Sequence, residues 1–539
     1  MHDTAVPPHT RSRRWRSVAA ATVAAAALVL SACASGSSAP AGPAGEGGEL
    51  DTVTVAFPGS LANLYIGQEG GILNYYLAAT VQEGLVSIND EGQFEAALAT
   101  GWEIPDENTY VFTLRDDAKF HNGDPVTADD VVFSIEQAAN PETSLSTSYY
   151  LFNLASVEKT GDNEVTVTTG YPDASFLSAL SNVGALVVTQ QSYWEEHGGA
   201  VGTSSSLLMG TGPYQVTEFQ PDSHVLLERA DTWWGEAPKV NEIRIDFIPD
   251  ENTRLLAAQK GEIDVAFNVP INQAQQWEQI GDGRVEAVND LSYVGLIFDQ
   301  NVAPFDDPDV RAAIAHSFDR ELVAERLLRG YGEVATAIMT PESLGQAYSS
   351  EAAHELLATV PQFDFDLDQA QQLLDGSSAA GGFATELTFP NTGPQLGTAA
   401  QALAENVKQL GIDLSVREVP LEEWLATIGD GEHGLGFMWY FSTTGDPAEV
   451  NSYLLGPENP NGWVSDEAQA LIEEASARTD PAERSDALRA LETLGADNAV
   501  NAPLWWGQTI TYFKNTVGVD SFSPFTFLGP WGASLHGTN

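Results

Sequence analysis

The stretch "LRDDAKFHNGDPVTADDVVFSIE", residues 114–136, places one histidine and several aspartates close together, as a metal or acid–base site would. The residues that lead into it, "YVFTLRDDAKF" (110–120), alternate apolar and polar side chains, which predicts a half-buried strand. Thr127 and Asp130 then fit a capping box, in which each side chain bonds to the other residue's backbone N–H at a helix start. His121 has no second histidine at metal-ligand spacing. We therefore interpret the stretch as structural.

The same stretch belongs to a longer pattern. It resembles the hallmark of family 5 extracellular solute-binding proteins, the peptide- and nickel-type receptors of ABC importers. Further segments that resemble this family follow it or precede it in the family's order: Val81–Trp102, Gly210–Asp250, Thr253–Phe267, Phe305–Gly332 and Gly445–Leu454. The resemblance covers nearly the whole chain from Thr52 to Asp520, and several long collinear segments are far more specific than one short motif.

The resemblance implies an α/β architecture of the type II periplasmic-binding-protein kind, with two α/β lobes around a ligand cleft and an inserted N-terminal domain. The expected division is lobe I in residues 50–74, 207–300 and 502–539, the inserted domain in 75–206, and lobe II in 301–501. "SYVGLIFDQN" (292–301) and "APLWWGQTITYF" (502–513) are predicted strands that cross between the lobes. Closure about such a hinge would bury the solute.

The composition excludes several classes of protein. The chain has 539 residues, which predicts more than one hydrophobic core. Its net charge of −53 argues against a nucleic-acid partner, because phosphate backbones are bound through basic patches. Hydrophobic residues make up 43% of the chain, too many for a disordered acidic tail. The single cysteine, Cys33, excludes a disulfide within the chain.

Residues 1–32 are predicted to be a signal peptide. A run of arginines precedes the apolar segment Val18–Leu30, whose thirteen residues are too few for a typical spanning helix. "LSAC" (30–33) resembles the bacterial lipobox, which implies lipidation of Cys33, and a flexible tether (33–49) follows. We therefore expect a lipid-anchored protein on the outer face of the cell membrane. A cleaved signal with an incidental cysteine is the alternative, and Sec and twin-arginine export both remain open.

Catalytic signatures are absent from the sequence: there is no G-x-S-x-G, no H-E-x-x-H and no P-loop. The alternating aspartates of "FDFDLDQAQQLLDG" (363–376) suggest a calcium loop, but Gln369 and Asp375 stand where an EF-hand needs glycine and glutamate. Asp368 is instead predicted to cap the following helix. We expect no enzymatic activity, no cofactor and no metal ion; a secreted hydrolase and a surface adhesin are the alternatives.

The walls of the cleft are predicted to be aromatic, because a closing receptor surrounds its solute with rings and a few fixed polar groups. In "FMWYFSTTGDP" (437–447) a short strand delivers a polar turn, and Tyr440 lies where the family resemblance places a ring against the ligand. Trp439, its neighbour on the strand, must face the other way. Trp505 and Trp506 pose the same choice on the returning strand, and both are candidates.

Tyr65, after the first strand, is a further candidate from the opposite lobe. In peptide-binding members of the family, an aspartate four residues before the proline pairs with the ligand's amino terminus, and here that position is Thr443. A neutral hydroxyl does not supply the charge-assisted bond that an ammonium favours. Asp446 remains a candidate, although the resemblance implies that it serves the turn.

The predicted solute is therefore an oligopeptide or a peptide-like compound, with an oligosaccharide or a metal chelate as alternatives within the same fold. The expected partners are this small ligand and an ABC permease in the membrane, and the receptor is expected to be a monomer.

Overall fold

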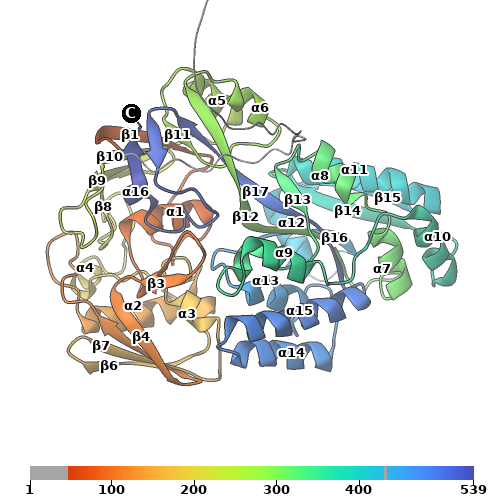
Figure 1. Cartoon of the computed structure of the whole chain (residues 1–539), viewed down its shortest axis with the longest axis horizontal. Helices are drawn as coiled ribbons and strands as arrows, with labels where there is room; N and C mark the ends of the chain where they lie inside the picture. Colours follow the sequence, from red (N-terminus) through yellow and green to blue (C-terminus); the bar gives the residue numbers. More distant parts are fainter. Residues whose placement is uncertain (1–46, 430–433, 539) are drawn as a thin grey trace, which may run out of the picture. The chain divides into compact units, whose positions relative to one another are not determined.

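Two long antiparallel strands run through the centre of the fold: β12 (Gly283–Phe298) and β17 (Asn501–Lys514) (Figure 1). The computed structural model describes residues 47–429 and 434–538, so Cys33 and the predicted signal peptide and most of the tether lie outside the described residues. The second half of β17 pairs with β11, and the second half of β12 pairs with β16. The two predicted crossing strands thus lie largely within β12 and β17, and one sheet continues across them.

The nine-stranded sheet has the order β16-β12-β17-β11-β1-β10-β9-β8, with β13 also pairing with β17. β1 is parallel to β10 and β11, whereas β9, β12 and β17 pair with their neighbours in the antiparallel sense. The remaining bounds in this sheet are β1 Leu50–Phe57, β8 Tyr214–Gln220, β9 His224–Arg229, β10 Val240–Phe247, β11 Val265–Ala266, β13 Gly332–Val334 and β16 Leu435–Phe441.

The inserted domain has a sheet and a core of its own. Its antiparallel strands have the order β4 (Ala99–Asp106), β5 (Thr109–Leu114), β7 (Glu164–Thr169) and β6 (Leu154–Gly161). Helix α2 (Ala128–Ala139) contacts β6 and β7, and its buried Val131 and Ile135 belong to this core.

The predicted start of the inserted domain, residue 75, falls inside helix α1 (Ile72–Val81). Tyr75, Tyr76 and Leu77 pack in the same cluster as Val53 and Val55 of β1, because the whole helix covers lobe I. The separately packed part of the insertion therefore begins after α1.

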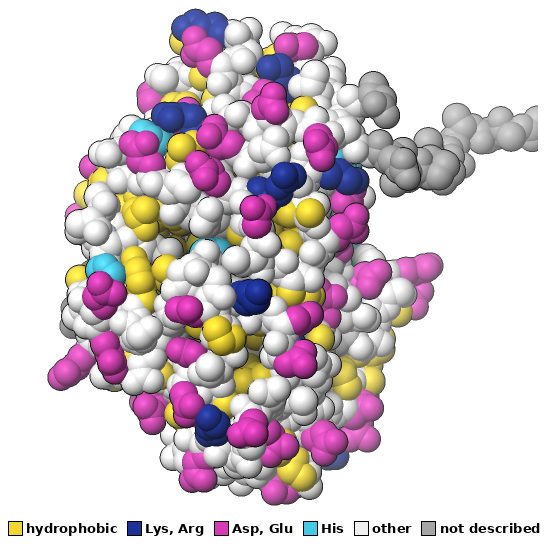
Figure 2. Space-filling view, turned by 90° about the vertical axis from the view of Figure 1, so that its left-hand side faces the viewer, with side chains coloured by type: hydrophobic (Ala, Val, Ile, Leu, Met, Phe, Trp, Pro, Cys, Tyr) yellow, Lys and Arg dark blue, Asp and Glu magenta, His cyan; other side chains and the backbone are white. Residues whose placement is uncertain are grey.

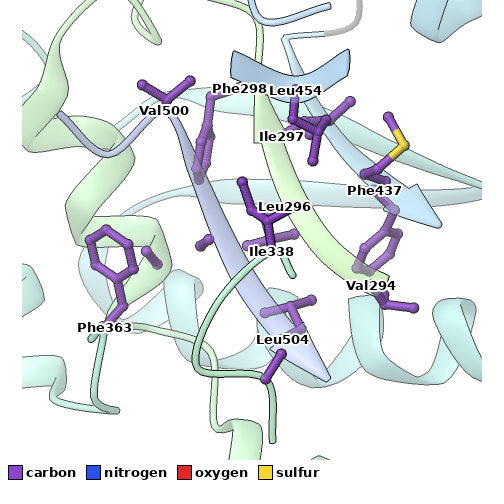
Figure 3. Close-up of a cluster of buried hydrophobic side chains, with 14 of the residues drawn as sticks. Val294, Leu296, Ile297, Phe298, Ile338, Phe363, Phe437, Leu454, Val500 and Leu504 are labelled. Atoms are coloured by element: carbon purple, nitrogen blue, oxygen red, sulfur yellow. The ribbon is translucent and has the colours of Figure 1, made fainter. Parts of the chain in front are cut away.

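Lobe II encloses the largest apolar cluster, which Figure 3 shows around the second half of β12. A parallel pair, β14 (Ala384–Pro390) and β15 (Asp413–Val419), extends this lobe. Its helices are α7 Pro308–Ala315, α8 Arg320–Arg326, η2 Pro341–Leu344, α9 Ser350–Leu357, α10 Leu367–Gly376, α11 Pro394–Val407, η3 Lys408–Leu410, α12 Leu421–Gly429, α13 Pro447–Leu455, α14 Asp466–Ala477 and α15 Pro481–Asp497.

Short elements complete the described chain. They are η1 Ser148–Leu151, α3 Phe176–Ala179, α4 Gln191–Glu196, α5 Glu251–Gln259, α6 Ala274–Glu278 and α16 Trp531–Ser534, with the strand pairs β2 Val86–Ile88 and β3 Phe94–Ala96, and β18 Val517–Val519 and β19 Leu535–Gly537. Over the residues that are described, no helix has both the length and the apolar character that crossing a membrane requires.

The structural interpretation of the 114–136 stretch is confirmed. Thr127 and Asp130 form the predicted capping box at the start of α2. The His121 ring lies between two backbone groups, with Nε2 3.1 Å from the Gly212 carbonyl and Nδ1 accepting from the Gly210 N–H at 3.3 Å. Burial lowers the pKa of His121 to about 4, so the ring is neutral and ties the turn to the 210–212 loop.

One predicted cap is wrong. Asp366, not Asp368, begins α10, because its extended backbone lets its carboxylate accept from the Gln369 N–H at 2.9 Å. Asp368 lies in the first turn of the helix, where a negative charge is still favoured by the helix dipole.

Acidic side chains are spread over the surface. Figure 2 shows Asp and Glu distributed across the face it displays, with few Lys or Arg between them. This distribution agrees with the net charge of −53 and shows no basic patch on that face.

Candidate functional site

The turn that follows β16 carries the site. Gly445 has a φ of +67°, a left-handed conformation that favours glycine, and it turns the chain toward α13. Asp446 then caps α13 by accepting from the Ala448 N–H at 2.8 Å, and Pro447 occupies the first position of the helix. Because the turn is fixed at both ends, the side chains at 440–449 have defined directions.

Asp446 forms a buried ion pair with Arg484 of α15. Two guanidinium nitrogens donate to the carboxylate at 2.7 and 2.8 Å. Burial alone would lower the pKa of Arg484, but the charge and hydrogen bonds of Asp446, together with the nearby Asp173 charge, outweigh burial and raise that pKa. Ser175 of the inserted domain bonds to both partners, at 2.6 Å from Arg484 and 3.2 Å from Asp446. Asp446 therefore has a satisfied structural role and joins lobe II to the inserted domain.

Glu449, three residues further on, has a different environment. Its carboxylate accepts from the hydroxyls of Tyr440 at 2.9 Å, Ser442 at 2.6 Å and Thr444 at 2.5 Å. In the described part of the chain, no Lys, Arg or His side chain forms an ion pair with it. Burial raises the pKa of Glu449, the three hydroxyl bonds act against this shift, and the nearby Asp446 charge adds to it.

Tyrosines from both sides surround this carboxylate. Tyr150 of η1 has its hydroxyl 3.0 Å from Thr443 Oγ1, and its ring is 4.2 Å from that of Tyr149. On lobe II, the rings of Tyr440 and Tyr453 are 5.7 Å apart. We name Tyr149, Tyr150, Tyr440, Thr443, Glu449 and Tyr453 the Tyr–Glu cluster. The negative charge of Glu449, together with stronger desolvation, raises the pKa values of Tyr149, Tyr150 and Tyr440.

The Tyr–Glu cluster keeps accessible surface although it lies at an interface between domains. Tyr149 is 56% exposed and Tyr453 is 39% exposed, while Glu449 and Tyr440 are half-buried. Fully exposed side chains would not be desolvated, and core side chains would not be accessible. The cluster thus combines desolvated polar groups with exposed aromatic rings, which are the kinds of group that line solute-binding sites.

The structure brings together only some of the predicted site residues. Tyr440 and Thr443 belong to the Tyr–Glu cluster, and Asp446 lies beside it in the ion pair with Arg484. Trp439 is directed away from Tyr440, with its ring close to Gly393, as strand alternation requires.

The other three predicted aromatic residues lie in apolar cores. Tyr65 packs edge-on against Trp194, and its hydroxyl is 3.0 Å from Ser144 Oγ. Trp505 and Trp506 belong to the lobe II core with 4% and 3% of their surface exposed, and Trp506 Nε1 donates to the Ala337 carbonyl. The structure does not place these three residues in the cluster.

Sequence reasoning missed Tyr149, Tyr150, Tyr453 and Glu449. The "SYY" triplet at 148–150 is a local aromatic signal in a segment with little periodicity, which favours a surface role. Glu449 carried no signal, since an acid in the first turn of a helix is ordinarily explained by the helix dipole.

Other features of the molecule are weaker candidates. A pocket of about 390 Å³ on lobe I is lined by Gln259, Gln276, Gln279, Ile280, Gly281 and Asp282, without an aromatic ring or a buried charge. Within residues 47–429 and 434–538, no group of three His, Cys, Asp or Glu side chains has the arrangement of a metal site. The Tyr–Glu cluster is therefore the strongest candidate.

Known proteins similar to this chain share its organisation. The dipeptide-binding protein DppE of Bacillus subtilis is 26% identical over 457 residues, which cover 79% of this chain and 81% of that protein. Heme-binding protein A of Haemophilus influenzae is 25% identical over 476 residues, covering 82% of this chain and 84% of that protein. Both relatives are named as binding proteins.

Solved structures show the same fold. The substrate-binding protein CtaP of Listeria monocytogenes aligns with a TM-score of 0.78 at 19% identity, covering 91% of this chain and 100% of that chain. NikA from Brucella suis, solved with Fe(III)-EDTA, aligns at 0.75 with 22% identity over 90% of this chain and 100% of that one. The predicted two-lobed periplasmic-binding-protein fold is thereby confirmed.

The family described as "Bacterial extracellular solute-binding proteins, family 5 Middle" matches residues 93–462. This match covers most of the inserted domain, from residue 93 on, together with the crossing strand β12 and the Tyr–Glu cluster. The chain therefore belongs to family 5 of the bacterial extracellular solute-binding proteins, the family that the sequence pattern predicts.

Proposed function

We propose that the protein is the receptor of an ABC importer, and that it captures a small peptide-like solute at the Tyr–Glu cluster and delivers it to a membrane permease. The observation that carries the proposal is that the cluster is assembled from two parts of the molecule, with Tyr150 of the inserted domain 3.0 Å from Thr443 of lobe II. A site divided in this way becomes complete only when the two parts approach each other.

Further contacts across the same interface support closure. The Ala174 N–H donates to the Ser476 carbonyl at 2.8 Å, and Ser175 bonds to the Asp446–Arg484 pair. These bonds join short segments, and the buried apolar side chains of the inserted domain and of lobe II form separate clusters. We infer that the described arrangement is the closed state and that β12 and β17 bend when the lobes open.

A peptide-like solute is favoured by the names of the relatives, which include dipeptide-, oligopeptide- and glutathione-binding proteins. An oligosaccharide is the second candidate, because the exposed rings of Tyr149 and Tyr453 are suited to stacking on a sugar face. The absence of a suitable ligand set in the described residues gives a bare metal ion no support.

We also propose that the chain is exported and held on the outer face of the membrane by a lipid on Cys33. This proposal rests on the "LSAC" sequence and the basic and apolar segments before it. Replacement of Cys33 by serine should release the protein from the membrane fraction, and a variant that stays membrane-bound would contradict the anchor.

Receptor function is tested by native mass spectrometry of protein purified from its own host, which identifies a co-purified solute, followed by small-angle scattering with and without that solute. We expect stoichiometric binding and a decrease in the radius of gyration. Tight binding with an unchanged radius of gyration would contradict closure, and catalytic turnover of the solute would contradict a receptor.

A further inference from the structure

We propose that Glu449 anchors a positively charged nitrogen of the solute, a protonated amine or an alkylated ammonium group. The inference rests on the proposed function and specifies which chemical class of solute the receptor selects. It also assigns the charge recognition to Glu449 of α13 rather than to Thr443 or Asp446.

The charge of Glu449 is not balanced by a cation among the described residues. A carboxylate removed from water is costly unless a cation or several donors compensate it. Asp446 has the Arg484 guanidinium at 2.7 Å, but Glu449 has hydroxyl partners alone among the described residues. Hydroxyl donors stabilise the ionised carboxylate without neutralising it. A cationic group of the solute would supply the positive charge that no described side chain places beside Glu449.

The Glu449 carboxylate also has unused capacity to accept hydrogen bonds. Each ionised carboxylate oxygen accepts about two hydrogen bonds. Glu449 Oε2 already accepts from Ser442 and Thr444, whereas Oε1 accepts only from Tyr440. One acceptor position on Oε1 is thus left unfilled by the described residues, and Glu449 as a whole residue is only half-buried.

The rings of the Tyr–Glu cluster are a further feature that favours a cation. Tyr149 and Tyr150 lie on one side of the cluster, and Tyr440 and Tyr453 lie on the other. The faces of aromatic rings attract cations, and desolvation strengthens the attraction. Hydroxyls, rings and one carboxylate favour a cationic group, while no Lys or Arg in the cluster would attract an anion.

A purely structural role is the competing explanation. In that case Glu449 would only brace the 442–446 turn through Ser442 and Thr444. The two explanations differ in one measurable property, since bracing a turn confers no preference for a charged solute over its neutral isostere.

The experiment uses a defined mixture of tri-, tetra- and penta-alanine, the N-acetylated form of each, choline with its neutral isostere 3,3-dimethyl-1-butanol, and maltotriose. The full chain is incubated with this mixture and the retained compounds are identified by native mass spectrometry. The variants are Glu449→Gln, which removes the charge and keeps the shape, and Glu467→Gln as a matched control. Glu467 is exposed on α14 and forms no ion pair in the described structure.

We expect the wild type and Glu467→Gln to retain cationic members at least tenfold over their neutral counterparts, and Glu449→Gln to lose this ratio. Equal retention of charged and neutral members by the wild type would overturn the anchor while leaving receptor function intact. Selectivity that persists in Glu449→Gln would do the same.

Retention of maltotriose alone would overturn both the cationic and the peptide-like solute, yet not the receptor. Retention of nothing would overturn the peptide-like proposal together with the anchor. The ratio of cationic to neutral compounds retained by the wild type does not depend on whether Glu449→Gln folds. The pH dependence of retention, also measured on the wild type, therefore tests the proposal even if that variant unfolds. Acidification, which protonates Glu449, should release the cationic members first, and pH-independent retention would contradict the proposal.

Discussion

Asp446 and Glu449 are carboxylates three residues apart at the start of the same helix, and their surroundings differ in burial and in charge compensation. Asp446 is buried, caps α13 and receives two charged hydrogen bonds from Arg484. Glu449 is half-buried, receives three neutral hydroxyl bonds and has no cationic partner within the described residues. The charge of Asp446 is neutralised within the fold by Arg484, whereas the charge of Glu449 is not neutralised by any described side chain.

This difference shows how one turn combines stability with recognition. The compensated pair holds the turn against the inserted domain through Ser175. Because the turn is fixed by that pair, Glu449 is held beside the tyrosines in a defined position, at the expense of its own solvation. Changes to the first carboxylate's environment should therefore alter folding, and changes to the second should alter binding.

The largest effect is expected for Arg484→Ala. Removing the guanidinium leaves the Asp446 carboxylate buried without a partner, which should lower the free energy of unfolding by about 3–5 kcal/mol. Urea denaturation measures this loss. Arg417→Ala is the matched control, because Arg417 pairs with Glu386 and Glu423 at the surface, where water screens ion pairs, so its loss should lower the free energy of unfolding far less. Equal losses of unfolding free energy in Arg484→Ala and Arg417→Ala would contradict a special structural role for the buried Asp446–Arg484 pair.

A third buried carboxylate extends the comparison. Glu492 accepts from the N–H groups of Ile338 and Met339 and from Asn451, and burial raises its pKa to about 7. A raised pKa in the folded state means that the fold favours the protonated Glu492. The resulting contribution to the free energy of unfolding is fully present below the unfolded-state pKa near 4.5 and is lost as the pH rises through about 7.

The stability of the wild type relative to Glu492→Gln should therefore fall by about 3 kcal/mol between these two pH values. Urea denaturation of both proteins across that range isolates the contribution of Glu492, because other titrating groups cancel in the difference. A difference that stays constant with pH would show that Glu492 titrates normally.

Tyr149→Ala should affect binding far more than folding. The ring is 56% exposed, so its loss should change the free energy of unfolding by less than about 1 kcal/mol. If it stacks on the solute, affinity should fall by roughly tenfold, measured by calorimetry with the solute identified by mass spectrometry. Phe365→Ala, another exposed aromatic at 43%, is the control and should leave affinity unchanged. Unchanged affinity in Tyr149→Ala would remove this ring from the site.

The smallest effect on stability is expected for Glu449→Gln. The amide loses hydrogen bonds to the hydroxyls but no longer requires desolvation of a charge, so the free energy of unfolding at neutral pH should change by less than about 1 kcal/mol. Since burial raises the pKa of Glu449, the wild type should lose stability relative to this variant as the pH rises above the usual value for glutamate. A loss of several kcal/mol would place Glu449 with Asp446 as a structural residue.

The family and the two-lobed fold were predicted from a resemblance that covers nearly the whole chain, whereas several local features were predicted because they depend on neighbours along the chain. The capping box of Thr127 and Asp130 involves residues three positions apart, and Asp446 with Pro447 forms a helix start whatever surrounds it. The crossing strands carried their own apolar pattern. The misplaced cap at Asp368 shows the limit of such rules, since two aspartates two positions apart satisfy them equally.

The site depended on contacts that no local pattern records. Tyr440 and Thr443 were found because the family resemblance covers them, whereas Trp505 and Trp506, with the same aromatic signal, face the lobe II core. Tyr150 lies within hydrogen-bond distance of Thr443, nearly three hundred residues further along the chain. Asp446 forms an ion pair with Arg484, whereas Glu449 accepts hydrogen bonds from hydroxyl groups alone among the described residues. Sequence determines which groups a segment can offer; tertiary packing decides which of them are compensated, because desolvation and charge pairing depend on distances between segments that are remote along the chain.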